Sequence, residues 1–176
     1  GMMHTYLLRW SIPYRPSPGG MMHTYLLSLG ANLGRRLITL RLAVRELARR
    51  GEILAVSSVW ETAPLGMKGE HPAFLNCAVH FDTYLDPRQL LACCKRLEER
   101  AGRDLEERYQ SRPLDIDIIT WSGGEWQDPS LVIPHPRAGK RRFVVIPCNE
   151  IIPDTFQEPE EPQDMAFFCG GDALLP

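Results

Sequence analysis

The sequence contains little lysine and no excess of positive charge. Its lysines are only Lys68, Lys95 and Lys140, arginine supplies the other basic side chains, and the formal net charge is −2. A general nucleic-acid binder is normally basic, so the composition argues against that class. Arginine is a better bidentate partner than lysine for phosphate and carboxylate groups. Small anionic ligands therefore remain a candidate class of binding partner.

The chain also lacks long apolar runs and paired cysteine motifs. No run reaches the length of about eighteen apolar residues that a transmembrane helix needs, and the N-terminus lacks the apolar block of a signal peptide. The five cysteines show no Cys-x-x-Cys pair and no zinc-ligand spacing, and their odd number fits a reducing compartment. We therefore expect a soluble, cytoplasmic protein of 176 residues with a single core.

Three segments are expected along the chain. The sequence of residues 2–8 recurs at 21–27, with prolines between the copies, so residues 1–20 are interpreted as an N-terminal extension, either an artefact or a misassigned start. If the first copy is ordered, an added edge strand is its expected form. Residues 21–154 form the main domain. The tail, residues 155–176, is rich in Glu, Pro and Gln and expected to be irregular, although residues 165–168 could dock onto the body.

The periodicity of apolar residues predicts an α+β fold. Strands are expected at about 25–29, 53–60, 74–84 and 114–121, with helices from after Gly34 to about Arg50 and from Pro87, capped by Asp86, to about Ala101. The resulting order β-α-β-β-α-β is the ferredoxin-like arrangement, a four-stranded antiparallel sheet with both helices on one face. The other face is left free for a site, and further elements follow, including a short strand at 131–133.

Two carboxylates on the last of these strands are the first candidate site. Asp115 and Asp117 alternate with apolar residues, so they share a face and lie roughly 7 Å apart. Adjacent carboxylates repel, and Mg²⁺ relieves this repulsion by binding one or two of them and completing its shell with water and phosphate oxygens. An isolated pair is more often a solvated outer face, so other residues must decide between these interpretations.

Several further motifs, in collinear order from about Tyr25 to Pro153, resemble one family. This chain is similar to the 6-hydroxymethyl-7,8-dihydropterin pyrophosphokinases of the folate pathway. The resemblance implies transfer of the β,γ-pyrophosphoryl group of ATP to the pterin's hydroxymethyl oxygen, with release of AMP. The matching motifs are Ser28–Gly34, Ser57–Gly66, Phe74–Asn76, Gly102-Arg103, Arg112–Ile118, Ile133–Pro136, Arg141, Phe143 and Glu150–Pro153.

The resemblance also implies roles for single residues. Asp115 and Asp117 are expected to bind two Mg²⁺ ions that bridge the triphosphate, and Asp115 is a candidate for taking the hydroxyl proton. The expected catalytic residues are Asp115, Asp117, Arg103 and Arg112. The expected ATP-binding residues are Glu98, Arg103, Arg112, Ile118, His135 and Arg141. Without the pattern, a histidine between two prolines would be interpreted as a structural loop residue.

The expected pterin site combines an amide with aromatic rings. Asn76 would read the hydrogen-bonding edge of the pterin, and aromatic side chains would stack on its ring. Taken alone, these aromatic residues would more often belong to a core, and Asn76 to an exposed strand face. The residues implied by the resemblance are Thr62, Pro64, Leu65, Phe74, Asn76, Tyr109 and Phe143. The partners are then a pterin and ATP, bound by a monomer or weak homodimer, without nucleic acid or membrane.

The segment 103–113 departs from the family pattern. Arg103 is followed by Asp104 rather than a second arginine, the Trp-Gly-Pro before Arg112 is absent, and the loop is shorter. Because this loop closes over substrates in the family, two alternatives stay open: a diverged paralogue acting on another pterin, and a non-catalytic pterin- or nucleotide-binding module. An RNA-binding or structural ferredoxin-like domain is disfavoured, because a basic sheet face is missing.

Overall fold

The computed structural model describes residues 20–32, 34–63, 73–103, 113–160 and 162–175. Two 3-10 turns, η1 and η2, accompany three α-helices and eight strands in these ranges. None of the helices in the described part of the chain is long and apolar enough to cross a bilayer.

In chain order the elements are β1 (His23–Ala31), α1 (Arg36–Ala48), β2 (Glu52–Val56), β3 (Val59–Thr62), β4 (Phe74–Thr83), α2 (Pro87–Arg103), β5 (Leu114–Trp121), β6 (Trp126–Asp128), β7 (Leu131–Ile133), η1 (Ala138–Lys140), α3 (Arg142–Ile151), β8 (Met165–Cys169) and η2 (Gly171–Leu174).

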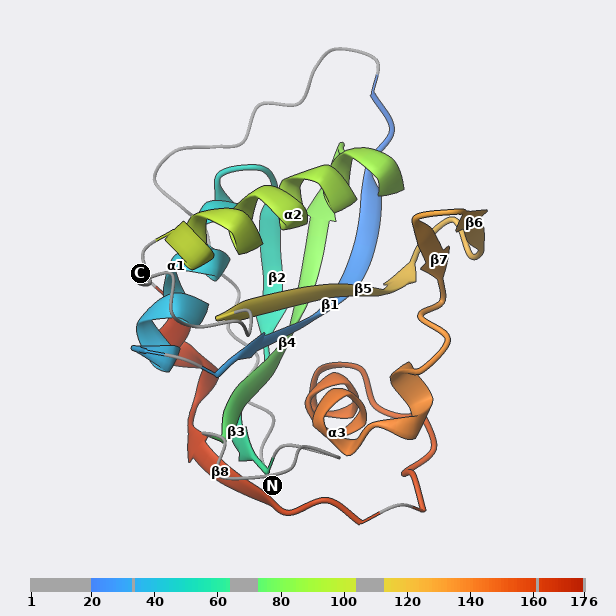
Figure 1. Cartoon of the computed structure of the whole chain (residues 1–176). Helices are drawn as coiled ribbons and strands as arrows, with labels where there is room; N and C mark the ends of the chain where they lie inside the picture. Colours follow the sequence, from blue (N-terminus) through green and yellow to red (C-terminus); the bar gives the residue numbers. More distant parts are fainter. Residues whose placement is uncertain (1–19, 33, 64–72, 104–112, 161, 176) are drawn as a thin grey trace.

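The predicted ferredoxin-like order is confirmed, within a larger sheet. The main antiparallel sheet has the order β5-β1-β4-β3-β8, and β2 also pairs with β4 (Figure 1). The single strand predicted at 53–60 is wrong: Ser57 and Ser58 separate β2 from β3. At this break the Ser57 hydroxyl oxygen accepts a hydrogen bond from the Ala78 backbone N–H at 2.7 Å, and Glu150 of α3 accepts one from the Ser58 N–H. These side-chain bonds replace part of a regular ladder.

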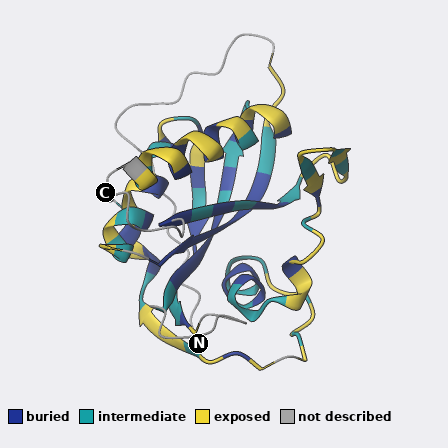
Figure 2. Cartoon of the chain, in the orientation of Figure 1, coloured by how far each residue is buried: buried dark blue, intermediate teal, exposed yellow. Residues whose placement is uncertain are grey.

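The two faces of the sheet bury two separate groups of apolar side chains. Leu75, Cys77 and Val79 of β4 face α1 and α2 in the larger cluster, as their alternation predicts. The opposite face is not wholly free, because Ala78 packs in a second cluster with residues of α3 such as Val144. Helix α3 covers this part of the sheet (Figure 1), and the buried strands lie between the two layers (Figure 2). Only the uncovered remainder of the second face can hold a site.

Helix α2 begins where the sequence predicts. The Gln89 N–H donates to the Asp86 carboxylate, and the Asp86 N–H donates to the Gln89 side-chain oxygen, each at 2.9 Å. This reciprocal pair satisfies two backbone donors that the first turn of a helix leaves open. The helix then runs to Arg103, slightly beyond the predicted end at Ala101.

The tail is more ordered than the sequence suggests. The expected docking of residues 165–168 is confirmed, because β8 pairs with β3 in an antiparallel ladder that sets Met165 opposite Thr62. Beyond β8, Leu174 of η2 is fully buried in the larger core cluster. The tail therefore completes one edge of the sheet (Figure 1). The expectation of an added edge strand from the first sequence copy lies outside the described residues.

Candidate active site

The register of three strands brings the candidate site together. Gly30 of β1 lies opposite Asn76 of β4 on one side and opposite Asp115 of β5 on the other. Residues directly opposite in an antiparallel pair share a face, so these three form one row across the sheet. Two residues along β1, Ser28 lies beside Asp117 in the next row. The amide and both carboxylates thus share the face that α3 covers only in part.

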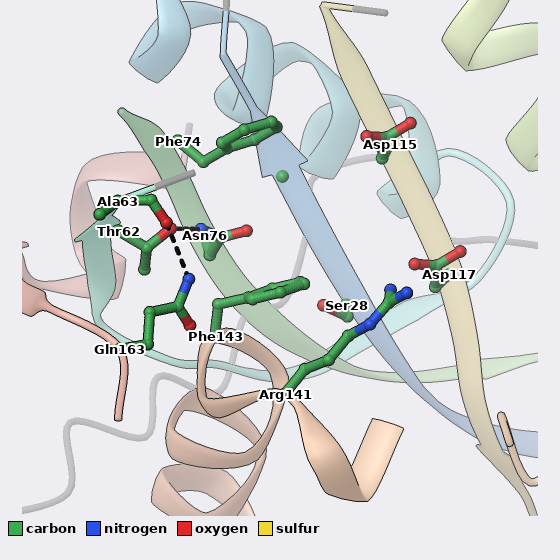
Figure 3. A pocket seen from close by; sticks show the side chains of 11 residues that line it. Ser28, Thr62, Ala63, Phe74, Asn76, Asp115, Asp117, Arg141, Phe143 and Gln163 are labelled. Carbon is green, nitrogen blue, oxygen red and sulfur yellow. Dashed lines mark hydrogen bonds between the residues drawn. The ribbon is translucent and has the colours of Figure 1, made fainter. Parts of the chain in front are cut away.

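This face carries a cavity of about 350 Å³. Figure 3 shows Asp115 and Asp117 on one side of it, with Asn76 and Thr62 across from them. Two aromatic rings, from β4 and from the first turn of α3, also line it. The lining residues are Ser28, Gly30, Thr62, Ala63, Phe74, Asn76, Asp115, Asp117, Arg141, Phe143 and Gln163. A small cavity with apolar walls and a few converging polar groups is the usual form of a small-molecule site.

The Asn76 amide is oriented by a buried hydrogen bond. Its Nδ2 donates to the Thr62 hydroxyl oxygen at 2.6 Å, and the two side chains are 3% and 2% exposed. Because the nitrogen is held toward β3, the oxygen of the amide lies on the opposite side, toward the cavity (Figure 3). A buried amide held in this way offers a fixed acceptor to a ligand.

The two carboxylates fit a magnesium site that substrate oxygens complete. Asp115 and Asp117 are both half-buried on β5 and lie two residues apart on one face. Within the described ranges, no group of three or more His, Cys, Asp or Glu side chains could enclose a metal ion. Mg²⁺ commonly binds one or two carboxylates together with water and phosphate oxygens rather than a full protein cage, so the donor set is appropriate for that ion.

A second cavity, of about 290 Å³, shares the lining residue Asp117 with the first. Asp117 is the residue of the described chain that lines both. The walls of the second cavity come from α2, β5, β7 and the segment that follows β7. They are formed by Leu91, Lys95, Ile116, Asp117, Ile118, Pro129, Ser130, Leu131, Val132, His135 and Pro136. Two ligands placed in these cavities would therefore meet beside one carboxylate.

His135 is held as a neutral side chain in the second cavity. Burial lowers its pKa below the ordinary value, against the attraction of Asp117, and the positive charges of Arg141 and Arg137 lower it further. Its Nδ1 accepts a hydrogen bond from the Arg137 backbone N–H at 3.2 Å. The proton of the neutral ring is then on Nε2, which leaves this nitrogen as a donor.

Arg141 and Phe143 enter the first cavity from the start of α3. Arg141 is the residue that precedes the helix, and its guanidinium carbon lies 5.7 Å from the centre of the Phe143 ring. This cation–π contact holds both groups on the cavity wall. Figure 3 shows the Arg141 side chain extending from the start of α3 toward the strand that carries Asp117, so a positive charge is available to an anionic group bound near this carboxylate.

Not every residue implicated by the sequence lies in these cavities. Glu98 lines neither of them within the described chain; it is 8% exposed, and its Oε2 accepts a hydrogen bond from the Ile116 N–H at 3.1 Å. Lys95 lies 3.4 Å from its Oε1. Glu98 therefore ties α2 to β5. Ile118 packs in the core and reaches the second cavity. Four implicated residues, and the side chain of Arg103, lie outside what the structure describes: Pro64, Leu65, Tyr109 and Arg112.

The structure adds residues that the sequence reasoning missed. Gln163 reaches the first cavity from the tail, and Lys95 lines the second. Ser28 and Gly30 belong to a recognised motif but had no assigned role. Spacing on β1 could have indicated them, because they alternate with the buried Leu27 and Leu29. Gln163 carries no local signal, since its position depends on how the tail packs.

Comparisons with known proteins identify the family of the chain. The sequence profile of the family 7,8-dihydro-6-hydroxymethylpterin-pyrophosphokinase (HPPK) matches residues 26–153. A 2-amino-4-hydroxy-6-hydroxymethyldihydropteridine pyrophosphokinase from Methylorubrum extorquens is 38% identical over 130 residues, which is 73% of this chain and 82% of that protein. The protein of the same description from Bacillus subtilis is 37% identical over 127 residues, covering 71% of this chain and 75% of that protein.

Longer proteins also match. A mitochondrial folate synthesis bifunctional protein from Pisum sativum is 37% identical over 127 residues, and the chain spans only 24% of its length. A crystal structure of Plasmodium falciparum HPPK-DHPS with pterin and p-hydroxybenzoate has a TM-score of 0.59 and 18% identity, over 81% of this chain and 41% of that chain. That structural likeness supports the fold, while the sequence matches show the family. The chain belongs to the 7,8-dihydro-6-hydroxymethylpterin-pyrophosphokinase family.

Proposed function

We propose that the two cavities that share Asp117 are the active site of a pyrophosphokinase of folate biosynthesis. The membership of the chain in its family supplies the reaction: pyrophosphate passes from ATP to the hydroxymethyl group of 6-hydroxymethyl-7,8-dihydropterin, and AMP leaves. The observation that supports the proposal best is the position of Asp117, which lines both cavities. Two substrates that react directly need adjoining sites with charged groups at the junction.

The first cavity is the proposed pterin site. Phe74 and Phe143 supply apolar faces for a flat ring, and Asn76 supplies a fixed amide oxygen for its polar edge. Thr62 acts through Asn76, because its hydroxyl holds the amide nitrogen. The proposed contacts of Pro64, Leu65 and Tyr109 rest on the family resemblance alone.

The second cavity is the proposed site of the nucleotide. His135 and Ile118 line it, and the neutral His135 ring offers a donor to the nucleotide. Arg141 lies on the side of the first cavity, in position to bind the phosphates that pass the junction. We also propose that Arg103 and Arg112 contact the phosphates, on the basis of the family resemblance alone. Glu98 acts by holding β5, since it bonds the backbone of that strand.

The reaction forms a bond between the hydroxymethyl oxygen and the β-phosphorus and breaks the bond between that phosphorus and the oxygen that AMP retains. Asp115 and Asp117 would hold Mg²⁺, which neutralises the charge of the triphosphate when bound. Asp115 is the proposed acceptor of the hydroxyl proton. The cavity walls orient the hydroxymethyl group for in-line attack, and the aromatic side chains exclude water from the pterin side.

We keep the expectation that the protein works as a monomer or weak homodimer. The five cysteines are free thiols, four of them buried, which supports work in a reducing compartment such as the cytoplasm.

Replacement of the junction carboxylate tests the proposed site. We expect Asp117→Ala to lower pterin-dependent AMP formation at least about a hundredfold, because the metal it would hold is worth several kcal/mol in the transition state. The variant should fold normally, since Asp117 is only half-buried and faces away from the larger core. AMP formation and the binding of Mn²⁺, followed by its electron paramagnetic resonance, are the measurements.

Glu52→Ala is the matched control, because Glu52 is an exposed strand carboxylate at the other end of the sheet, opposite Asp82. It should leave both readouts unchanged. Near-normal turnover by a folded Asp117→Ala protein would refute the assignment of the metal site.

A further inference from the structure

Arg36, the first residue of α1, joins this helix to one end of the sheet. Its Nη1 donates to the Ala73 backbone carbonyl at 2.6 Å, and its Nη2 lies 2.9 Å from Oε2 of Glu61. The guanidinium carbon also lies 5.9 Å from the centre of the Phe168 ring. The Arg36 side chain is only 25% exposed. One half-buried cation therefore connects α1 with β3, with the residue before β4 and with β8.

These contacts surround the last residue pair of the β3–β4 ladder. That pair is Thr62 and Phe74, and both residues line the first cavity (Figure 3). Thr62 directly follows Glu61 on β3, and successive side chains of a strand point to opposite faces. The carbonyl of Ala73 belongs to the peptide bond that leads into Phe74. Contacts made by Arg36 on the helix face therefore fix the backbone that carries two side chains on the cavity face.

The end of this ladder needs such support. Terminal parts of a strand pair open more readily than central parts, and the Asn76 amide depends on the terminal pair, because its Nδ2 donates to the Thr62 hydroxyl oxygen. An ion pair at the surface contributes little by itself. Arg36, however, adds a charge-assisted hydrogen bond to a backbone carbonyl and a cation–π contact, so its three partners restrain one another.

Arg36 acts at a distance from the proposed substrates. Within the described chain it lines neither of the two cavities, and its partners lie on the α1 side of the sheet edge. We propose that Arg36 is a positioning residue of the pterin site, which keeps Thr62 and Phe74 in place before the ring binds. The inference rests on the proposed function, since it takes the first cavity as the pterin site. If the pair is ordered for only a fraction of the time, the apparent affinity for the pterin falls by that fraction.

The test measures AMP release with the pterin and ATP varied in turn. The proteins are wild type, Arg36→Met, Arg36→Lys and Arg41→Met, and the urea midpoint of each is measured in parallel. Methionine keeps the apolar stem and removes every donor. Lysine keeps the charge for Glu61 but lacks the planar fork that reaches two acceptors at once. Arg41 is an exposed arginine in the middle of the same helix, so its replacement is the matched control.

We expect Arg36→Met to raise the KM for 6-hydroxymethyl-7,8-dihydropterin about tenfold, the value of a charge-assisted hydrogen bond. The KM for ATP and kcat should stay within about twofold, because binding alone is affected and the second cavity has other walls. Arg36→Lys should restore part of the affinity, with a KM for the pterin about threefold above wild type. Arg41→Met should match wild type in all three constants.

A merely structural role would give a different pattern. Equal rises of both KM values in Arg36→Met, or a KM for the pterin that stays at the wild-type value, overturns this inference and leaves the pterin site standing. If the methionine variant does not fold, the same comparison of the two KM values in Arg36→Lys decides. A wild-type protein that releases no AMP in response to the pterin overturns the proposed function, and the inference with it.

Discussion

At the scale of single residues, the shape of the first cavity depends on Gly30, because glycine has no side chain. Gly30 lies between Asn76 and Asp115 in the register of the sheet. A Cβ atom at Gly30 would lie 2.9 Å from Oδ1 of Asn76, which is closer than ordinary contacts allow. The amide would have to move, because the obstructing atom is the end of a side chain and the strand backbone is fixed by pairing on both sides. Glycine therefore leaves the room in which Asn76 can face a ligand.

We expect Gly30→Ala to weaken pterin binding about tenfold, the value of one well-made hydrogen bond, while the affinity for ATP with Mg²⁺ stays within about twofold, because the second cavity does not include Gly30. Calorimetric titration with each ligand measures both. Gly139→Ala is the control, since its added carbon would meet Phe156 at an ordinary 3.6 Å. Equal loss of both affinities in Gly30→Ala would show a general distortion and contradict this explanation.

His80 is expected to make the folded protein less stable in acid. Burial lowers its pKa, and the attraction of Asp82 only partly opposes this. The unfolded chain, with a histidine pKa of about 6.5, then binds protons more readily than the native state. The contribution of the neutral His80 side chain to the free energy of unfolding is therefore fully present above the pKa of the unfolded chain. It is lost as the pH falls toward the lower pKa of His80 in the folded protein.

We therefore expect the urea midpoint of wild type to fall between pH 7.5 and pH 5.5, and His80→Gln to reduce that fall, because glutamine does not titrate. The difference between the midpoints at the two pH values is the measurement. An identical fall in both proteins would show that His80 contributes nothing to the acid sensitivity.

At the scale of elements, the tail is a structural part of the sheet and of the core. Leu174 of η2 is fully buried with residues of α1. We expect Leu174→Ala to lower the free energy of unfolding by about 2–5 kcal/mol, the usual cost of a cavity left by a buried leucine. Leu42→Ala on α1, where the leucine is 49% exposed, should change it by about 0.5 kcal/mol or less. Chemical denaturation measures both, and equal effects would contradict the docking of η2.

The elements differ in how far the sequence predicts them, for physical reasons. β4 and the first half of β5 carry apolar residues at every second position, so the face that each turns to the larger core, and with it the shared opposite face of Asn76, Asp115 and Asp117, is predictable. Helix α3 was missed because Pro147 lies inside it and its apolar residues are mostly β-branched, features that favour other structures. The break at Ser57 depends on bonds to distant residues, which no local pattern encodes.

The contribution of the tail to the candidate site is likewise not predictable from local sequence. Gln163 reaches the cavity because β8 pairs with β3, a contact between residues about a hundred positions apart in sequence, as in the Gln163–Ala63 bond. Composition favoured an irregular tail, because it is rich in proline and acidic residues. Pairing with an open sheet edge and burial of Leu174 outweigh this local preference. Residues that reach a site through such long-range contacts can be identified only from the structure.

At the scale of the whole molecule, two cavities and the carboxylate that lines both make up the proposed active site. The proposed pterin cavity and the second cavity share Asp117, at the proposed junction of the two substrates. Helices α1 and α2 support the sheet from the other face, and α3 and the tail build the walls of the first cavity. This arrangement explains a direct transfer between two bound substrates.

The most direct test is the release of AMP from ATP and Mg²⁺, with and without 6-hydroxymethyl-7,8-dihydropterin, with all nucleotides separated by chromatography. We expect AMP formation that requires the pterin and equals the amount of pterin diphosphate formed, with no accumulation of ADP. Release of ADP, or AMP formed at the same rate without pterin, would contradict it.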